Sequence, residues 1–291
     1  MKILITGATG FIGKEVLKLL SKKNFKIIAT FSNKKPNNLV IPKVKWKKLD
    51  IFNHNSFKIE NNIDLVIHLI WPFLPDYQNK KHLTINLNAQ KKFINSLTKK
   101  GIKNFFFAGT CYEYGKQSGK LKENIKKKPN NPYAISKNLL NSYLISLSKK
   151  KKINITWGRI FYIYGFNERR DTLYNLIIDK RKREQIKVAN NFFRDYLDIK
   201  TIAKLIVILS LAKKNFGTVN LSSGFAISLK NLINYFLRTN QIKATIKYEK
   251  KTNTFEPDRF YGDNTKLKKI LKQNLSDFKY QKKIKEILKH K

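Results

Sequence analysis

A tyrosine and a lysine four residues apart are the side chains in this 291-residue chain best suited to catalysis. Tyr133 and Lys137 lie in Tyr133-Ala-Ile-Ser-Lys137, and a helix over 132–150 would place them on one face. A tyrosine with a pKa near ~10 is a weak acid or base at neutral pH, but a nearby ammonium stabilises its phenolate. The pair could therefore move a proton to or from a hydroxyl group. The same spacing also arises by chance in a chain rich in both residue types, so a second signal is needed.

Three glycines near the start of the chain supply that signal. Gly7, Gly10 and Gly13 form G-x-x-G-x-x-G after the apolar run Ile3-Leu-Ile5 and before a helical pattern over 14–20. In dinucleotide-binding folds such glycines permit a tight turn, a close approach of backbone amides to a pyrophosphate, and close helix–strand packing. The unpaired N–H groups and the dipole of the helix N-terminus then favour the phosphates. We expect a dinucleotide site here, the alternative being an ordinary strand-to-helix turn.

Strand and helix patterns alternate along the first 160 residues, which is typical of a parallel doubly wound sheet. Strands are expected at 3–5, 26–30, 44–49, 64–70, 103–108 and 154–161, and helices at 14–20, within 77–99 and at 132–150. We predict an α/β protein with a Rossmann-type doubly wound parallel sheet and a smaller C-terminal substrate-binding lobe. The dinucleotide-binding domain is expected over 1–165, completed by part of 195–220, and the smaller lobe mostly over 166–291.

The run after the second expected strand bears on the choice of cofactor. An acidic side chain there binds the ribose 2′-hydroxyl and repels a 2′-phosphate. This chain instead has Phe31-Ser-Asn-Lys-Lys35, without a carboxylate, which favours NADP(H) over NAD(H). The alternative is that these lysines belong to a general excess of lysine. Asp50 is placed to meet an adenine amino group, although an exposed turn aspartate would look the same.

The charge of the chain is strongly positive, with 61 Lys+Arg against 19 Asp+Glu and a formal net charge of +42. Such a balance can indicate nucleic-acid binding. Here the lysines are spread along the whole chain beside many Asn, Ile, Phe and Tyr residues, all with A/T-rich codons. We therefore attribute the charge to base composition and expect no specific nucleic-acid partner, although a basic surface would attract anionic nucleotides.

Cysteine and histidine content limits the remaining chemistry. Cys111 is the only cysteine, which excludes an internal disulfide and a cysteine-rich metal site. His68 is expected to pack at a strand end and His54, His82 and His290 to lie on the surface, so no metal site is predicted. Met1 leads almost directly into an apolar run and no run approaches membrane-spanning length, so we expect a cytoplasmic protein that does not bind a membrane.

Together these motifs resemble the extended short-chain dehydrogenases/reductases, and among them the NAD(P)-dependent epimerase/dehydratase family that acts on nucleotide sugars. The segment 6–13 matches the family's cofactor loop, Asp50-Ile51 its adenine contact, and Tyr133 with Lys137 its catalytic pair. The segment 109–115 matches the hydroxyl-bearing block, with Thr110 where the family keeps a catalytic Ser or Thr. Segments 158–165 and 194–198 match later blocks, so the resemblance covers nearly the whole chain.

Segments 68–72, 74–77, 109–115 and the block from Arg194 most resemble the family's nucleotide-sugar 4-ketoreductases. The 4,6-dehydratases carry an Asp-Glu pair directly after the catalytic threonine, where this chain has Cys111 and Tyr112. Neither side chain can act as a carboxylate, so dehydration is disfavoured. Glu113 follows one place later, and it is expected either to touch sugar hydroxyls or to be a capped or surface glutamate.

The resemblance implies hydride transfer between a nicotinamide and C4 of the sugar, interconverting a 4-keto-6-deoxy nucleotide sugar and its 4-hydroxy form in deoxysugar or surface-polysaccharide biosynthesis. Tyr133 would donate the proton, Thr110 would hydrogen-bond the same oxygen, and Lys137 would hold the ribose and lower the tyrosine pKa. The implied cofactor-binding residues are Gly7, Thr9, Gly10, Phe11, Ile12, Gly13, Ser32, Asn33, Asp50, Ile51, Leu69, Tyr133 and Lys137. The implied substrate-binding residues are Trp71, Asn86, Glu113, Arg194 and Arg259, with the two arginines expected at the diphosphate.

Two other functions remain open. A nucleotide-sugar 4-epimerase would use the same residues but keep its cofactor bound and oxidise its substrate transiently. A non-catalytic dinucleotide-binding protein would keep the fold, although the presence of Thr110, Tyr133 and Lys137 argues against it. We expect the protein to be a homodimer. We expect its substrate to be a nucleotide-diphosphate sugar.

Overall fold

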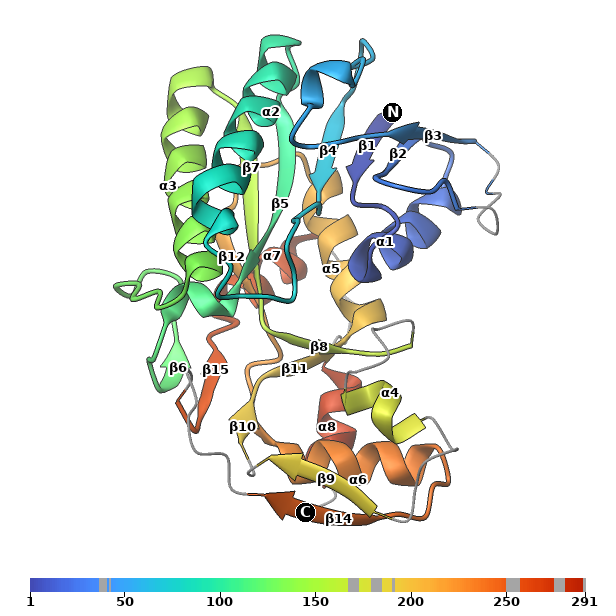
Figure 1. Ribbon diagram of the computed structural model, residues 1–291, viewed down its shortest axis with the longest axis vertical. Coiled ribbons are helices and arrows are strands. Elements are labelled where there is room, and N and C mark those ends of the chain that lie inside the picture. Colours follow the sequence, from blue (N-terminus) through green and yellow to red (C-terminus); the bar gives the residue numbers. More distant parts are fainter. Residues whose placement is uncertain are drawn as a thin grey trace.

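A seven-stranded parallel sheet forms the larger part of the computed structural model, which describes residues 1–36, 41, 43–166, 173–178, 185–189, 192–249, 257–274 and 281–289 (Figure 1). Neighbouring strands pair in parallel throughout this sheet. The strands in spatial order are β12 (Gly217–Leu221), β7 (Asn154–Ile160), β5 (Asn104–Thr110), β4 (Leu65–His68), β1 (Lys2–Thr6), β2 (Lys26–Phe31) and β3 (Val44–Lys48). The predicted fold class is confirmed.

The strand order reverses beside β1. From β1 the chain builds β2 and β3 on one side and then returns to place β4 on the other, so that Thr6 pairs with His68. In open parallel sheets ligands bind at such a switch point, in the crevice outside the carboxyl ends of the strands. The glycine turn directly after β1 lies at this crevice.

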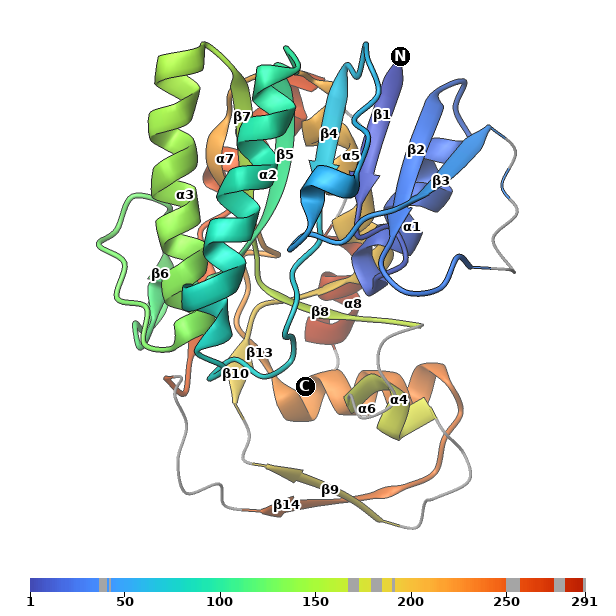
Figure 2. The same cartoon turned by 45° about the horizontal axis from the view of Figure 1, so that its top comes forward.

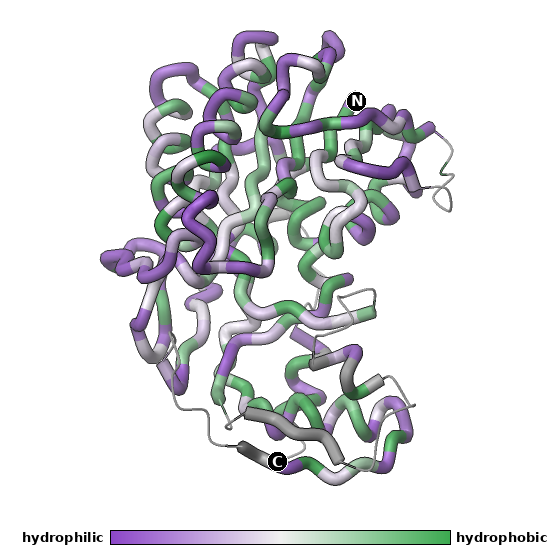
Figure 3. The backbone as a smooth tube through the Cα atoms, in the orientation of Figure 1, coloured by the Kyte–Doolittle hydropathy of each residue, from purple (hydrophilic) through white to green (hydrophobic). Residues whose placement is uncertain are grey.

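Helices cover both faces of the sheet because neighbouring side chains on a strand point in opposite directions. Ile3 and Ile5 pack with α1 (Phe11–Ser21) and α5 (Ile199–Leu211), whereas Leu4 packs with α2 (Leu87–Lys99) and α3 (Pro132–Lys151). Figures 1 and 2 show these two helix pairs on opposite faces. Figure 3 shows hydrophobic positions along the central strands and hydrophilic ones on the outer turns.

A smaller lobe lies beyond the carboxyl ends of the strands (Figure 1). Its helix α6 contacts α4 and α8, and its strands β14 and β9 pair in parallel. The elements of this lobe are α4 (Leu173–Ile178), β9 (Gln185–Ala189), α6 (Leu229–Thr239), β14 (Thr245–Glu249) and α8 (Lys282–Lys289). Helix α7 (Thr265–Asn274) instead contacts β12 of the main sheet.

Short strand pairs connect the lobe to the sheet. They are β8 (Tyr162–Tyr164) with β11 (Tyr196–Asp198), β10 (Phe193–Arg194) with β13 (Ile227–Ser228), and β6 (Gly119–Leu121) with β15 (Phe260–Gly262). The expected helix within 77–99 is shorter than its pattern: a π-helical turn at His82–Asn86 precedes α2. Within the described residues, no helix is long and apolar enough to cross a membrane.

Candidate active site

The glycine turn after β1 fits the diphosphate of a dinucleotide. Gly7 has a φ of +68°, and a Cβ there would lie 2.9 Å from the Ile70 backbone nitrogen. A Cβ on Gly13 would lie 2.1 Å from the Gly7 carbonyl oxygen, so α1 could not pack this closely on β1. Gly10 caps α1 without a side-chain hydrogen bond, and the first turn of α1 holds no acidic residue. The N–H groups in the first turn of α1 are therefore available to a phosphate, whereas the Gly10 N–H donates to the Gly7 carbonyl oxygen at 3.0 Å.

The other predicted cofactor residues surround this turn. Thr9, Phe11 and Ile12 are half-buried, and Ser32 and Asn33 are exposed beyond the end of β2. The remaining predicted cofactor residues follow β3 and β4. Asp50 is exposed and its Oδ1 accepts a hydrogen bond from the Phe52 N–H, while Ile51 is buried. Leu69 and Ile12 both line the neighbouring cleft, which joins the glycine turn to the catalytic residues.

The three predicted catalytic residues line one cleft of about 310 Å³. Thr110 ends β5, and Tyr133 and Lys137 lie in the first turns of α3, whose start is fixed by Asn131 Oδ1 accepting from the Ala134 N–H at 2.8 Å. Thr110, Tyr133 and Lys137 are 8, 7 and 5 % exposed. The topology thus brings together a hydroxyl, a phenol and an ammonium from two separate elements.

Burial dominates the electrostatics of the pair. It raises the pKa of Tyr133 well above its ordinary value, assisted by the nearby Tyr77 phenol and opposed by a hydrogen bond to Thr110. Burial also lowers the pKa of Lys137 to about 7, against a smaller opposing effect of Glu113. The pKa of Lys137 is therefore close to neutral pH, in the range where acid–base groups work best.

The expected lowering of the tyrosine pKa by Lys137 is not present in this arrangement. The Lys137 Nζ donates to the Ala108 carbonyl oxygen at 2.7 Å and lies 3.8 Å from the centroid of the Trp71 ring. Its distance to the centroid of the Tyr133 ring is 5.9 Å. The ammonium is therefore directed at a carbonyl and an indole face, and desolvation of the phenol outweighs its influence.

Trp71 lines the cleft as predicted, but the histidine behind it is not on the surface. His82 is fully buried, with its ring stacked on Trp71 at a centroid distance of 6.3 Å. Its Nδ1 accepts from the Trp71 Nε1–H at 3.2 Å, so its Nε2 is left to donate to the Asp76 carbonyl oxygen at 2.9 Å. Burial lowers the pKa of His82, which favours this neutral form. The prediction of a surface His82 is wrong because the 71–82 loop folds back over it.

The other histidines follow the sequence more closely. His68 is buried at the end of β4, between the Thr6 hydroxyl at 2.9 Å and the Gln90 Oε1 at 2.6 Å, which confirms its packing role. His54 is half-buried beside Phe93 and is not fully on the surface. His290 lies outside the described residues. Among the described residues, no group of three His, Cys, Asp or Glu side chains is arranged to hold a metal.

Two predicted substrate contacts lie beneath the cleft and not in its wall. Asn86 is fully buried on the π-helical turn, where its Oδ1 accepts from the Gln90 Nε2 at 3.0 Å. Glu113 is also fully buried, and its carboxylate accepts from the Thr110 N–H, the Trp157 Nε1–H and the Arg159 guanidinium. Neither side chain is among the described residues of the cleft wall. Both side chains lie beneath the cleft wall, and their contact with the sugar stays a prediction.

The two predicted phosphate-binding arginines are neighbours on the side of the smaller lobe. Arg194 is only 3 % exposed, and its Nη1 donates to the carbonyl oxygens of Phe193 and Asp258. Its guanidinium lies 5.9 Å from the ring centroid of Tyr162, which itself lines the cleft. Arg259 is exposed and lies over the Phe193 ring at 5.3 Å. Their contact with a diphosphate stays a prediction.

The aromatic wall of the cleft is the part that sequence reasoning missed. Tyr77, Tyr112 and Tyr133 form a cluster, with Tyr77 centroids 5.0 Å from Tyr112 and 5.4 Å from Tyr133. Phe161 and Tyr162 add a second wall from the end of β7 and from β8. Tyr112 and Tyr162 lie inside the segments 109–115 and 158–165, and Tyr77 ends the segment 74–77. The resemblance of these segments was therefore the available signal, because no periodicity marks the loop that carries Tyr77.

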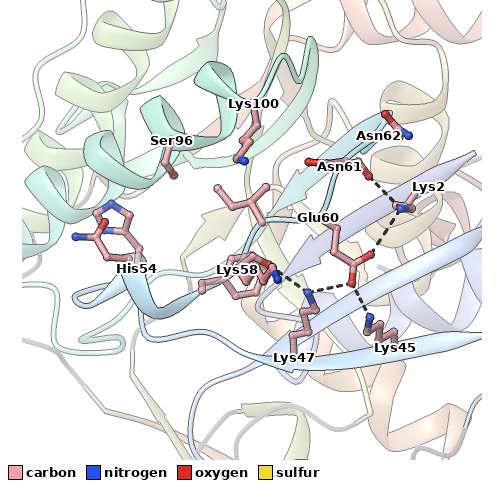
Figure 4. Close-up of a pocket in the computed structure, with 13 residues that line it drawn as sticks. Lys2, Lys45, Lys47, His54, Lys58, Glu60, Asn61, Asn62, Ser96 and Lys100 are labelled. Carbon is pink, nitrogen blue, oxygen red and sulfur yellow. Dashed lines mark hydrogen bonds and ion pairs between the residues drawn. The ribbon is translucent and has the colours of Figure 1, made fainter.

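A larger hollow of about 760 Å³ lies elsewhere, beside the amino end of β1 (Figure 4). In this hollow the Glu60 carboxylate forms ion pairs with three ammonium groups, those of Lys45 at 2.8 Å, Lys47 at 2.9 Å and Lys2 at 3.6 Å. Hydrogen bonds from Lys45 and Lys47 lower the pKa of Glu60 to about 2. This hollow is lined by surface lysines and ties the β3–β4 loop to the sheet edge, and we assign the chemistry to the smaller cleft.

Comparison with known proteins shows the family to which the chain is related. The model of the NAD dependent epimerase/dehydratase family matches residues 3–222, about three quarters of the chain. The dTDP-6-deoxy-L-talose 4-dehydrogenase (NAD(+)) of Aggregatibacter actinomycetemcomitans is 30% identical over 261 residues, covering 85% of this chain and 94% of that protein. The dTDP-4-dehydro-6-deoxyglucose reductase of Escherichia coli is 26% identical, covering 87% of this chain and 86% of that protein.

A solved structure is similar in fold. The UDP-N-acetylglucosamine 4-epimerase of Methanobrevibacter ruminantium M1, in complex with UDP-N-acetylmuramic acid, superposes with a TM-score of 0.84 at 22% identity. The match covers 99% of this chain and 96% of that one. At this identity the likeness speaks for the shared fold.

Proposed function

The chain belongs to the NAD dependent epimerase/dehydratase family, and we propose that it is an oxidoreductase that interconverts a 4-keto-6-deoxy nucleotide sugar and its 4-hydroxy form. One observation carries the proposal: Thr110, Tyr133 and Lys137 line a single cleft that reaches Ile12 of the glycine turn. A proton donor, an oxygen-binding hydroxyl and a ribose-binding ammonium are therefore gathered where a dinucleotide would end. We also propose that 1–165 with part of 195–220 binds the cofactor and that 166–291 mostly binds the sugar nucleotide.

Each residue has a distinct role in the reducing direction. A bound nicotinamide cofactor supplies the hydride. Tyr133 gives its proton to the C4 ketone oxygen as this oxygen becomes an alkoxide, because a buried phenol with a raised pKa holds its proton until that negative charge develops. Thr110 donates a hydrogen bond to the same oxygen, and Lys137 turns from the Ala108 carbonyl to the ribose hydroxyls and to Tyr133. That turn would restore the positive charge beside the phenol and favour the phenolate left after proton transfer.

The wall of the cleft supports a deoxysugar. The described lining residues include Trp71, Leu74, Tyr77, Phe161 and Ile163 and no carboxylate, and Lys137 is their only charged side chain. Such a surface accepts a methyl group at C6 at little cost, whereas a C6 carboxylate would lose water without gaining a dedicated cation. The two relatives named for 6-deoxy sugars, one a dehydrogenase and one a reductase, support the same substrate class.

We propose NADP(H) as the preferred cofactor, with NAD(H) as the alternative. The side chain at the end of β2 is Phe31, packed on Trp46 at a centroid distance of 6.5 Å, and it is followed by exposed Ser32, Asn33 and Lys34. None of these repels a 2′-phosphate. The relative named as an NAD(+) enzyme supports the alternative, so both cofactors belong in the assay.

The test is a panel of nucleotide sugars with each cofactor. Enzyme, NADPH or NADH, and dTDP-, UDP-, GDP- and CDP-linked 4-keto-6-deoxy sugars are incubated while absorbance at 340 nm is followed, and the products are identified by NMR. The proposal predicts that one molecule of NADPH or NADH is oxidised for each molecule of 4-hydroxy sugar formed. The corresponding 4-hydroxy nucleotide sugars are incubated separately without added cofactor, and inversion at C4 by enzyme that keeps tightly bound NAD would establish the epimerase instead. Cofactor binding without reaction on any sugar would establish a non-catalytic protein.

A further inference from the structure

A buried carboxylate directly beneath the catalytic threonine has no part in the chemistry described above. Glu113 is 0 % exposed, and its Oε1 accepts hydrogen bonds from the Thr110 backbone N–H at 3.0 Å and from the Trp157 Nε1–H at 2.8 Å. In return, the Thr110 hydroxyl accepts from the Tyr112 N–H at 3.3 Å. This reciprocal arrangement is a capping box, and it fixes the turn that carries the catalytic hydroxyl.

The charge of this carboxylate is held by a fully buried arginine. Arg159 of β7 donates to Glu113 Oε2 from Nε at 3.1 Å and from Nη2 at 2.9 Å. Its guanidinium also lies 4.3 Å from the centroid of the Tyr114 ring. A buried ion pair costs much desolvation and is a poor way to gain stability, so its presence here points to a role in geometry.

The residue before Thr110 is shaped for the same contact. A Cβ on Gly109 would lie 2.1 Å from Trp157 Nε1 and 2.8 Å from Glu113 Oε1. Only glycine therefore lets the indole of β7 reach the carboxylate past the backbone of β5. The neighbouring Ala108 offers its carbonyl oxygen to Lys137, so three consecutive residues at the end of β5 serve the site.

We propose that Glu113 is a positioning residue: by accepting from the Thr110 N–H, and being locked by Arg159 and Trp157, it holds the Thr110 hydroxyl in place in the cleft. Thr110 and Tyr133 line the same cleft, so this buried network sets the position of the hydroxyl relative to the proton donor. Without the acceptor, the 110–115 turn loses its anchor and the hydroxyl leaves its position on the C4 oxygen. A displacement of about 1 Å can lower a rate by about 100-fold.

The inference rests on the proposed function for its kinetic test, and that test uses two matched variants. Glu113→Met and Glu113→Gln are each made together with Arg159→Met, so that no buried charge is left unpaired in either protein. The Gln variant keeps an acceptor for the Thr110 N–H, and the Met variant removes it. Both are also made in a Thr110→Ala background. Glu123→Gln is the control, because Glu123 accepts from the Asn220 N–H of β12 at 3.0 Å and not from the Thr110 N–H.

The kinetic result separates positioning from a general structural role. With kcat counted per cofactor-binding site, we expect the Met variant to be about 10- to 100-fold slower than the Gln variant. We also expect a similar KM, and a larger isotope effect with 4-deuterated cofactor because the chemical step becomes slower. In the Thr110→Ala background the difference between Met and Gln should vanish. A Met-to-Gln ratio that stays the same without the threonine hydroxyl would overturn the proposal, as would equal kcat values in the parent background.

A second readout does not need any turnover. Hydrogen exchange of the Thr110 amide, followed by NMR, should become faster in the Met variant and stay near the parent rate in the Gln variant. If the parent enzyme turns over no ketosugar, the proposed function fails while this measurement still decides the inference. Unchanged protection of the Thr110 amide in the Met variant would refute it, even if the kinetics could not be measured.

Discussion

Lys137→Met is expected to stabilise the protein while abolishing its activity. Lys137 is 5 % exposed, and burial lowers its pKa from 10.5 to about 7. A lysine with a lowered pKa binds its proton less well in the folded than in the unfolded state. The unfavourable contribution is therefore small above pH 10.5, grows as the pH falls, and is complete below about pH 7.

The magnitude follows from the two pKa values. At pH 7 the difference amounts to roughly 4 kcal/mol, and at pH 9.5 to roughly 1 kcal/mol, at 1.36 kcal/mol for each tenfold change. Methionine forfeits the hydrogen bond to the Ala108 carbonyl, worth about 1 kcal/mol, and the contact of the ammonium with Trp71, worth about 1 kcal/mol. The net gain is about 2 kcal/mol at pH 7 and close to zero at pH 9.5. At pH 7 this is a rise in Tm of a few degrees.

The assay is thermal unfolding of cofactor-free protein at pH 7 and pH 9.5, with Lys91→Met as the control. Lys91 is half-buried with its ammonium over the Tyr143 ring at 5.3 Å, so it shares the aromatic contact without the deep burial. The control should change Tm little at either pH. A Lys137→Met protein less stable than the parent at pH 7, or a gain that does not shrink at pH 9.5, would refute the reasoning.

Four further results are expected. Glu60→Gln should lower the free energy of unfolding at neutral pH because it removes the ion pairs with three lysines, but only by about 1 kcal/mol, because the side chain is 21 % exposed and partly screened. Unfolding measured as a function of pH should show the full stabilisation by Glu60 above pH 4.5 and its loss as the pH falls toward 2. Phe31→Asp should move the ratio of Kd values toward NADH by repelling the 2′-phosphate, and equal parent affinities for both cofactors would contradict the NADP(H) proposal. Arg194→Ala should raise the Kd of the nucleotide sugar even at high salt, whereas loss of the effect at high salt would show a merely electrostatic influence. Binding to DNA or RNA should be independent of sequence and fall steeply with salt, and tight sequence-selective binding at physiological salt would contradict the attribution of the charge to composition.

The sequence was sufficient for the main sheet because its periodicities are local. The apolar runs at 3–5 and 26–30 and the glycine spacing at 7–13 correspond to β1, β2 and the turn into α1. The Tyr133 and Lys137 spacing likewise fixes two cleft residues, because a helix places residues four apart on one face. Thr110 joins them because β5 ends where α3 begins to pack.

The parts that could not be predicted depend on contacts far apart in sequence. Glu113 could have been a cleft or surface residue, and only the arrival of Arg159, 46 residues later, makes it a buried ion-pair partner. His82 is buried because the loop from Trp71 returns over it. The direction of the Lys137 ammonium depends on a carbonyl and an indole that no helical spacing reveals.

Transfer of a labelled hydride tests the central claim most directly. A 4-deuterated NADPH or NADH and the best 4-keto-6-deoxy nucleotide sugar are mixed with excess enzyme, and deuterium in the product is located by NMR for the parent and for Tyr133→Phe. The account predicts one deuterium at C4 of the sugar with the parent, and a rate about 10² to 10⁴ lower with Tyr133→Phe while cofactor affinity stays within a few-fold. Deuterium absent from C4, or a Tyr133→Phe rate close to that of the parent, would contradict it.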